Sequence, residues 1–504
     1  MPSQAETLVL RTDANRHIGS GHVMRCLALA QAWQDRGGQA IFVMTNPPAP
    51  LVERLRAEQV EVELLNASWG TADDARRTAE FARRSRAKWV VVDGYHFGSD
   101  YQQSLAGAGL KLLFIDDNGH AERYCADVVL NHNLHAREDL FKSRSPETQL
   151  LLGPRYAMLR REFGAWRSWR RQVSGVARNV LVTMGGSDPE NVTTTVIGAL
   201  PFVRNSGFDV TVVVGGSNPH IATLKQAAAG YSGPVRFEAN ASNMPELLAW
   251  ADVAVSAAGT TCWEMCLLGL PAILIDVAEN QHPVATELDR RGAAIHLGSA
   301  ATVSPEKIAE KLGWLVASLA ERKKLSSRAR EVVDGKGAAR VVAAMKGDLH
   351  LRRAEEADCR LLWEWANDPA VRAASFSGDT IPWNQHEQWF RSKLSDGNVL
   401  LCIAMNSEGK PIGHIRYQIE GDAATVSISI SPQFRDMGYG HRLLTRGSEE
   451  VFRNTAATAI SAYVKPENRT SLRLFRRAGF ATAPPATIHG QAAVHFILSK
   501  NGSG

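Results

Sequence analysis

Short apolar runs alternate with longer helical patterns along the first part of the chain. The stretches between the runs are rich in Ala, Arg and Glu and have the length and composition of helices. This alternation predicts a parallel sheet layered with helices over residues 1–165. The candidate strands are Leu8–Leu10, Ala40–Met44, Val60–Leu65, Trp89–Asp93, Leu112–Asp116 and Val128–Leu130.

The same alternation restarts after an Arg-rich connector. We interpret the connector, Arg160–Arg171 with Trp166 and Trp169 interleaved, as a solvated amphipathic helix between domains. The pattern beyond it predicts a second doubly wound domain over residues 175–345. Two such domains facing each other form a cleft of the kind that nucleotide-sugar enzymes use. The candidate strands here are Asn179–Met184, Val210–Val214, Val253–Ser256 and Ala272–Asp276.

Polar residues follow several of the first domain's runs. They are found at Asp93-Gly94-Tyr95-His96, at Asp116-Asp117-Asn118 and at Asn131–His135. In open α/β sheets the ligand crevice lies outside the carboxyl ends of the strands, so these residues are better candidates for chemistry than residues elsewhere. The alternative is that they cap helices and make turns.

A glycine-rich turn, Gly19-Ser20-Gly21, joins the first strand to a helical pattern that begins near His22. This arrangement presents backbone N–H groups and a positive helix end to an anion. Histidine is suited to act as a base near neutral pH. The motif G-x-G-x-x-G is absent, which disfavours a nicotinamide dinucleotide. A turn with a capping histidine remains the alternative.

A second cluster extends from Ser256 to Glu264. Gly259, Thr260 and Thr261 at a helix start suit a pyrophosphate. Glu264 lies one turn later on the same face, where its carboxylate could accept hydrogen bonds from ribose hydroxyls. Helix capping explains a threonine at this position but not an acidic residue within an apolar helix.

The pattern changes near residues 346–352, after a hinge expected at Gly335-Lys-Gly337. Residues 349–500 read as a separate α+β domain. The alternation Val426–Ile430 predicts a half-buried strand that runs directly into Arg435-x-x-Gly438-x-Gly440. A glycine loop between strand and helix again presents N–H groups to a pyrophosphate.

Composition narrows the class of partner. The chain has 504 residues, with 57 basic against 52 acidic, which indicates neither nucleic acid nor an anionic membrane as partner. Among the scattered cysteines, Cys262 and Cys266 form a close pair but no second pair accompanies them, so we expect no metal site. Reduced thiols, no signal sequence and no apolar run of ~18 residues predict a soluble cytoplasmic protein. The oligomeric state stays open.

The first 345 residues resemble the UDP-sugar hydrolases of pseudaminic acid biosynthesis, which have a two-domain glycosyltransferase-B-like (GT-B-like) fold. The matching motifs are Arg11-Thr-Asp13, Gly19-Ser-Gly-His22-Val-Met-Arg25, Asp116-Asp117, Leu152-Gly-Pro-Arg-Tyr156, Met184-Gly-Gly-Ser-Asp188, Ser256…Glu264 and Glu279-Asn-Gln281. The resemblance implies hydrolysis of UDP-2,4-diacetamido-2,4,6-trideoxy-β-L-altrose, with His22 as the catalytic base, C–O cleavage and inversion. The implied substrate and UDP ligands are Asp13, Gly21, Arg25, Tyr156, Gly185, Ser256, Gly259, Thr260, Thr261, Glu264, Asn280 and Gln281.

Residues 349–498 resemble the GNAT N-acetyltransferases, and among them the pseudaminic-pathway enzyme that acetylates the 4-amino group of UDP-4-amino-4,6-dideoxy-N-acetyl-β-L-altrosamine. The resemblance implies direct attack of the amine on the acetyl-CoA thioester, with a splayed strand holding the carbonyl. Asn367, His386 and Trp389 fall where relatives hold the nucleotide-sugar. The implied acetyl-CoA residues are Ile430, Arg435, Gly438, Tyr439, Gly440, His441, Asn468, Ser471 and Phe475.

Two positions depart from that resemblance. Phe475 stands where many relatives carry a tyrosine that protonates the leaving thiolate, and Ala366 stands where arginine is common. The domain is then slower, takes another substrate, or has moved the acid role to Tyr463 or Tyr439. The sequence therefore predicts a bifunctional enzyme that acetylates the amino sugar nucleotide and then hydrolyses it. The alternatives are a hydrolase with a degenerate acetyl-CoA-binding module, and a glycosyltransferase with a UDP-sugar donor.

Overall fold

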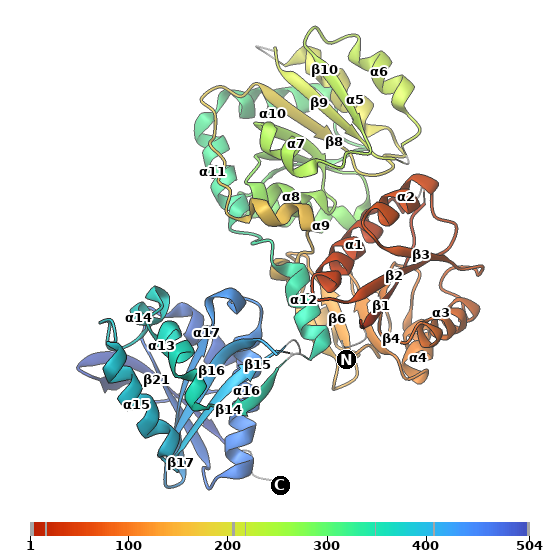
Figure 1. The fold of residues 1–504 in the computed structure, drawn as a ribbon. Coiled ribbons are helices and arrows are strands. Elements are labelled where there is room, and N and C mark those ends of the chain that lie inside the picture. Colours follow the sequence, from red (N-terminus) through yellow and green to blue (C-terminus); the bar gives the residue numbers. More distant parts are fainter. Residues whose placement is uncertain are drawn as a thin grey trace. The chain divides into compact units, whose positions relative to one another are not determined.

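A computed structural model describes residues 5–15, 18–203, 207–216, 218–347, 349–406 and 409–500. The chain divides into two compact units, Met1–Met345 and Lys346–Gly504 (Figure 1). Among the described residues, no helix is both long enough and apolar enough to cross a membrane.

The first lobe of unit 1 is a parallel sheet with the strand order β3-β2-β1-β4-β5-β6-β7. The chain runs outward from β1 in both directions, so the topological switch point lies between β1 and β4. The strands are β1 Thr7–Thr12, β2 Gln39–Met44, β3 Glu61–Leu64, β4 Ala87–Asp93, β5 Lys111–Ile115, β6 Val128–Asn131 and β7 Gln149–Leu152.

Helices cover both faces of this sheet. On one face, α1 (Gly21–Gln34) packs on Leu8 and Leu10 of β1. On the other, α3 (Ala72–Arg84) and α4 (Ser99–Gly107) pack on Val9. Strands that are covered on both faces favour continuous apolar runs such as Leu8–Leu10. The remaining helices of the lobe are α2 Ala49–Ala57, η1 Glu138–Phe141 and η2 Pro154–Tyr156.

The second lobe of unit 1 repeats this topology with the order β10-β9-β8-β11-β12-β13 and a switch point between β8 and β11. Its strands are β8 Asn179–Thr183, β9 Asp209–Val214, β10 Val235–Ala239, β11 Val253–Ala257, β12 Ala272–Asp276 and β13 Ile295–Ser299. Its helices are α5 Val192–Ala199, η4 Leu200–Phe202, α6 Ile221–Ala228, α7 Met244–Trp250, α8 Thr261–Leu268, η5 Glu279–Gln281, α9 His282–Arg290, α10 Pro305–Ala317 and α11 Leu319–Arg330.

The Arg-rich connector is not the amphipathic α-helix that its sequence predicts. It forms the 3-10 helix η3 (Arg161–Arg167) and then irregular chain. Arg171 donates to the backbone oxygens of Leu248, at 2.6 Å, and Ala251, so its guanidinium is used against the second lobe rather than solvated on a helix face. The connector is therefore held by hydrogen bonds to backbone oxygens of the second lobe rather than by a regular α-helix.

The last helix of unit 1, α12 (Gly337–Lys346), returns to the first lobe. Its Val341 and Met345 lie in the same core as the buried residues of α1. Gly337 permits this return, because a Cβ there would come within 2.0 Å of the Ala157 oxygen. The predicted second domain, 175–345, thus includes a helix that packs on the first lobe.

Unit 2 is a mostly antiparallel sheet with the order β14-β15-β16-β17-β18-β21-β19, and β20 pairs with β21. Its parallel pair, β17 and β18, separates after Thr425 and Ser461, although β17 continues to Ile430 and β18 to Val464. The strands are β14 His350–Arg353, β15 Val399–Met405, β16 Pro411–Glu420, β17 Ala423–Ile430, β18 Ala459–Val464, β19 Ala481–Thr482, β20 Ala486–Ile488 and β21 Gln491–Ser499.

Helices lie on both faces of the unit 2 sheet. Leu362 and Phe390 pack on β15 at one face, while Gly447 lets a long helix approach Tyr417 of β16 at the other. The helices are η6 Glu356–Asp358, α13 Cys359–Ala366, α14 Pro369–Ala374, α15 Trp383–Ser395, η7 Pro432–Phe434, α16 Tyr439–Asn454 and α17 Arg469–Arg477.

Candidate functional sites

His22 lies at the switch point of the first lobe, in the first turn of α1, the helix that follows β1 after the segment 13–20. Thr12, the end of β1, pairs with Asp93, the end of β4, and this pairing brings Asp93 beside His22. The Nδ1 atom of His22 is 2.7 Å from Oδ1 of Asp93, and the histidine side chain is 11% exposed. Since Nδ1 is held by the carboxylate, Nε2 is the ring nitrogen left for proton transfer.

Arg25 keeps the partner of His22 charged. Its Nε and Nη2 atoms each donate to Asp93 at 2.7 Å, and its Nη1 donates to Asp117 at 2.8 Å. Burial raises the pKa of Asp93, but Arg25 and then His22 outweigh it and lower that pKa well below its ordinary value. The same guanidinium lowers the pKa of the buried Asp117 to about 2. Both carboxylates are therefore ionised at neutral pH, and Arg25 is engaged by them.

Tyr95 connects this cluster to the second lobe. Its ring packs edge-on against the ring of His22, with centroids 5.0 Å apart. Its hydroxyl donates to Asp117 at 3.1 Å and accepts from Nδ2 of Asn280 at 2.8 Å. Asn280, which is predicted to contact the UDP-sugar, is thus hydrogen-bonded to Tyr95, whose ring packs on His22.

The loop that carries His22 also touches the glycine loops of the second lobe. A Cβ at Gly186 would come within 2.5 Å of Oγ of Ser20, and a Cβ at Gly21 would lie 3.9 Å from Oγ1 of Thr260. Gly185, with a φ of +85°, has open space where a side chain would point. The two switch points of unit 1 therefore face the same space.

The residues predicted to bind the nucleotide lie in the loop before α8 and in the first turn of that helix. Thr260 precedes the helix and Thr261 begins it. Ser256 is buried, and its hydroxyl donates to the Ala257 oxygen at 2.9 Å, so it supports the loop. Gly259 lies next to Gln281, whose Nε2 would be 3.9 Å from an added Cβ. The positive end of the helix dipole lies at this loop, although the N–H groups of Cys262 and Trp263 donate to the Gly259 and Thr260 oxygens.

Glu264 has a cationic partner from the connector. Oε1 accepts from Nη2 of Arg160 at 2.9 Å. Burial raises the pKa of Glu264, and the charge and hydrogen bond of Arg160 oppose that rise. Its predicted contact with ribose remains a prediction.

Two predicted ligands make other contacts. Asp13 accepts from the backbone N–H of Thr45 at 2.7 Å and lies 2.7 Å from Nη1 of Arg11. Tyr156 lies in the first-lobe core and is 6% exposed. These contacts support the fold, and neither residue is brought to His22. Their roles as ligands remain predictions.

In unit 2, the glycine loop ends in a helix start. Gly438 has a φ of +87° and directly precedes α16. Arg435 donates through Nη2 to Asp368 at 2.7 Å and through Nε to the Ile430 oxygen at 3.1 Å, which joins the loop to the end of β17. Tyr439, Gly440 and His441 lie in the first turn of α16, at the positive end of its dipole.

The second half of the predicted acetyl-CoA site begins at α17. Oδ1 of Asn468 accepts from the backbone N–H of Ser471 at 3.1 Å and caps this helix. Phe475 is 4% exposed, and its ring lies against Phe480 and Phe496, with centroids 5.1 and 5.8 Å away. The side chain of Phe475 is therefore part of an aromatic core contact, and its predicted place in the acetyl-CoA site remains a prediction.

The predicted acceptor residues gather on α13 and α15. Asn367 accepts from the Ile381 N–H at 2.8 Å and donates to its oxygen at 3.1 Å, which fixes the segment before α15. His386 is buried, and its Nε2 is 3.1 Å from the Cys359 oxygen. The guanidinium of Arg416 lies over the Trp389 ring, 5.2 Å from its centroid.

Two protein families match parts of the chain. The "Glycosyltransferase family 28 C-terminal domain" matches residues 179–342, and the "Acetyltransferase (GNAT) domain" matches residues 348–481. The chain is a fusion of a GT-B-like module and a GNAT domain. The predicted fold class, two Rossmann-like domains followed by a GNAT domain, is confirmed.

Three curated relatives share different parts of this fusion. An uncharacterized protein of Methanocaldococcus jannaschii is 21% identical and covers 94% of this chain and 96% of its own. The "Spore coat polysaccharide biosynthesis protein SpsG" of Bacillus subtilis is 27% identical over 47% of this chain and 68% of its own. The "UDP-2,4-diacetamido-2,4,6-trideoxy-beta-L-altropyranose hydrolase" of Campylobacter jejuni is 23% identical over 56% of this chain and 97% of its own.

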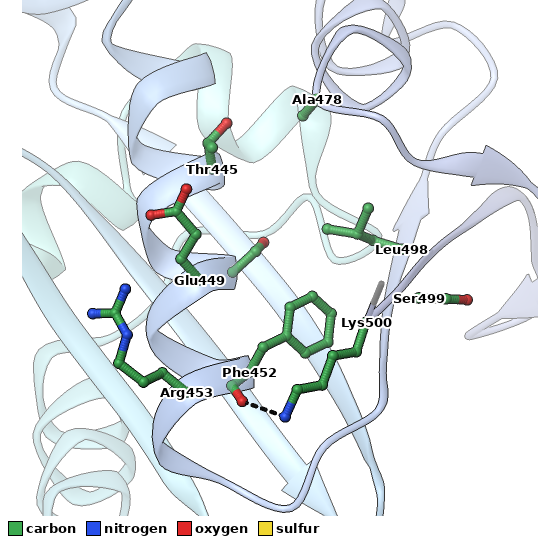
Figure 2. A pocket seen from close by; sticks show the side chains of 9 residues that line it. Thr445, Glu449, Phe452, Arg453, Ala478, Leu498, Ser499 and Lys500 are labelled. Atoms are coloured by element: carbon green, nitrogen blue, oxygen red, sulfur yellow. Dashed lines mark hydrogen bonds between the residues drawn. The ribbon is translucent and has the colours of Figure 1, made fainter. Parts of the chain in front are cut away.

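A hollow in the GNAT domain lies between α16 and the end of β21 (Figure 2). The side chain of Lys500 lines one side of the hollow, and its amine donates to the Phe452 oxygen at 2.7 Å. None of the predicted acetyl-CoA residues lines it. Its lining residues are Thr445, Ser448, Glu449, Phe452, Arg453, Ala478, Leu498, Ser499 and Lys500.

Sequence reasoning assigned no role to Asp93, Tyr95 or Asp117, although it marked all three as ends of strands. The signal was available in part, because each follows an apolar run of the first lobe. What the pattern lacks is the strand order, which places β4 beside β1 and so Asp93 beside His22.

Proposed function

We propose that unit 1 is a UDP-sugar hydrolase and that the GNAT domain supplies its substrate by N-acetylation. The observation that carries the first half is the His22–Asp93–Arg25 cluster, which faces the glycine loops of the second lobe. The names of relatives support the substrate class, UDP-2,4-diacetamido-2,4,6-trideoxy-β-L-altrose.

In the proposed hydrolysis, Nε2 of His22 takes a proton from water as the water oxygen attacks the anomeric carbon. The C–O bond to the diphosphate breaks, UDP departs and the configuration inverts. Asp93 stabilises the imidazolium that forms, and Arg25 keeps Asp93 ionised. Positioned base catalysis contributes about 10²–10⁴-fold.

UDP needs little help to leave, because its charge is already spread over two phosphates. The N–H groups at Gly259, Thr260 and Thr261 are positioned to stabilise the charge that develops on it. Asn280 and Gln281 would bind the sugar or the diphosphate beside Tyr95.

In the proposed acetyl transfer, the 4-amino group attacks the thioester carbonyl between the separated ends of β17 and β18. The bond to sulfur then breaks, the thiolate leaves and the new amide loses a proton. The loop from Arg435 to Gly440 would hold the pyrophosphate of acetyl-CoA. The acetylated product is the substrate of the hydrolase, which gives the fusion a chemical rationale.

The experiment is incubation of the full chain with the UDP-4-amino sugar, with and without acetyl-CoA, followed by mass spectrometry, NMR and thiol detection. We expect UDP, the free diacetamido sugar and one coenzyme A thiol for each sugar acetylated, and only when acetyl-CoA is present. In H₂¹⁸O the label should enter the sugar and not UDP, which reports C–O cleavage.

The other outcomes point to the alternatives. Release of the sugar only onto an added acceptor would indicate a glycosyltransferase. Binding of acetyl-CoA without thiol release, together with hydrolysis of the pre-acetylated substrate, would indicate a non-catalytic GNAT module.

A further inference from the structure

Three side chains of the second lobe converge at the end of β12. Asp276 ends the strand, His282 begins α9, and His296 lies on the neighbouring β13. Oδ2 of Asp276 is 2.9 Å from Nδ1 of His282 and 2.8 Å from Nε2 of His296. One ligand atom from each residue can be chosen so that all three lie within 4.8 Å of one another.

The carboxylate in this trio is only partly satisfied. Asp276 is 5% exposed, yet its Oδ1 has no hydrogen-bond partner, and within the described part of the chain no lysine or arginine pairs with it. A buried polar atom without a partner is uncommon in native structures and calls for an explanation such as an ion. His282 is 63% exposed, so the trio can be reached from solvent.

We propose that Asp276, His282 and His296 bind a divalent transition-metal ion of the zinc class. Two imidazole nitrogens and one carboxylate oxygen suit Zn²⁺, with water in the fourth position, whereas Mg²⁺ and Ca²⁺ prefer oxygen ligands alone. Small shifts that separate the nitrogens from Oδ2 would make room for the ion.

The second nitrogen of His282 is already oriented for this role. When Nδ1 binds a metal, the ring proton must lie on Nε2. That atom is 3.5 Å from Oγ1 of Thr286, which can accept the proton in a hydrogen bond. Outer contacts of this kind fix the tautomer of a metal-bound histidine.

The ion would fix the loop that its ligands flank. Asp276 and His282 enclose η5, in which Asn280 reaches Tyr95 and Gln281 accepts from the Val277 N–H at 3.1 Å. The metal site itself does not depend on the proposed hydrolysis, so the two proposals can fail separately.

The test is a titration of the metal-stripped full chain with Zn²⁺, followed by calorimetry. We expect one site that Mg²⁺ does not fill. His282→Ala should weaken it by about 100-fold or more, because loss of an outer-shell partner alone costs 10–100-fold. The matched control is His220→Ala, a half-buried histidine of the same lobe whose Nε2 lies 3.3 Å from the Pro189 oxygen. It should leave Zn²⁺ affinity unchanged.

A second readout guards against misfolding. Co²⁺ bound to the wild-type chain should give the intense visible absorption of a four-coordinate site, and His282→Ala should lose it while its circular dichroism is unchanged. Zn²⁺ binding that is equal in wild type and His282→Ala would overturn the proposal, as would a wild-type chain that binds no Zn²⁺.

Discussion

Replacing Asp93 by asparagine should abolish most of the proposed hydrolysis by unit 1 and leave the proposed UDP binding intact. Asparagine keeps the volume and one acceptor oxygen, but its amide carries no charge and presents N–H groups to Arg25 or His22. In the wild type, Asp93 receives Nδ1 of His22 and two donors of Arg25. The substitution therefore removes the counter-ion of the imidazolium and the fixed tautomer together.

The size of the effect follows from these contacts. Base catalysis supplies about 10²–10⁴-fold, and loss of the carboxylate behind a catalytic histidine costs up to about 10⁴ in kcat in serine proteases. We expect kcat and kcat/KM to fall together by about 10²–10⁴, since the contact matters when the imidazolium forms. UDP affinity should hold, because the proposed nucleotide loop lies on the other sheet.

Stability needs a control of its own, since breaking a buried ion pair costs about 3–5 kcal/mol. Asp74→Asn is the matched variant. Arg11 donates to both oxygens of Asp74, at 2.9 and 2.8 Å, and the pair is as buried as the one at Asp93. Asp74 makes no contact with His22 in the described structure, so its loss should lower the melting temperature without a fall in kcat of more than about tenfold.

The assay is UDP release from the diacetamido UDP-sugar, measured below the melting temperature of every variant, with UDP affinity from calorimetry. An Asp93→Asn enzyme that retains a tenth of wild-type kcat would refute the role of the pair. Equal loss in Asp74→Asn would show that the effect is one of stability.

Three further changes test other parts of the chain. Tyr95→Phe should lower kcat/KM about two- to tenfold, because it removes the hydrogen bond from Asn280 at about 0.5–1.5 kcal/mol and leaves the ring in place; Asn280→Ala should add little to it in the double variant. Burial, and after it the charge of Arg25, lowers the pKa of His132 from 6.5 to about 4. Between pH 6.5 and 4, the unfolded chain therefore binds a proton at His132 and the folded chain does not. Stability should therefore fall by about 3 kcal/mol as pH drops from 6.5 to 4, and His132→Gln should flatten that slope in urea melts. Gly438→Ala, at a φ of +87°, should weaken acetyl-CoA binding and destabilise the GNAT domain by about 1–2 kcal/mol, whereas Gly421→Ala, at +62° in a turn, should cost only stability.

Much of the architecture is readable from the sequence because buried parallel strands leave a strong pattern. The middle residues of β1 (Leu8–Leu10) and β4 (Trp89–Val92) are apolar and buried, and the strand ends carry polar residues. The His22 loop and the Gly259–Thr261 loop follow directly from this pattern, as each stands between a strand and a helix start.

Partners far apart along the chain cannot be read in this way. His22 and Asp93 are 71 residues apart, and only the order of strands makes them neighbours. The metal trio has the same character, since Asp276, His282 and His296 follow no ligand spacing and contain no cysteine. The connector fails for a related reason, because the acceptors of Arg171 lie about 80 residues further on.

Phe475 cannot donate a proton, but the absence of an acid at this position should slow the proposed acetyl transfer only modestly. With the cysteine pKa of about 8.5 taken for the leaving thiol, departure as a thiolate at pH 7 is uphill by about 1.5 pKa units, or about 2 kcal/mol. An acid at this position could recover at most about 30-fold by matching that difference. The Phe475 ring instead packs on Phe480 and Phe496, and this contact joins α17 to β21. The loss of the hydroxyl is thus compatible with turnover, provided that the amine is delivered unprotonated between β17 and β18.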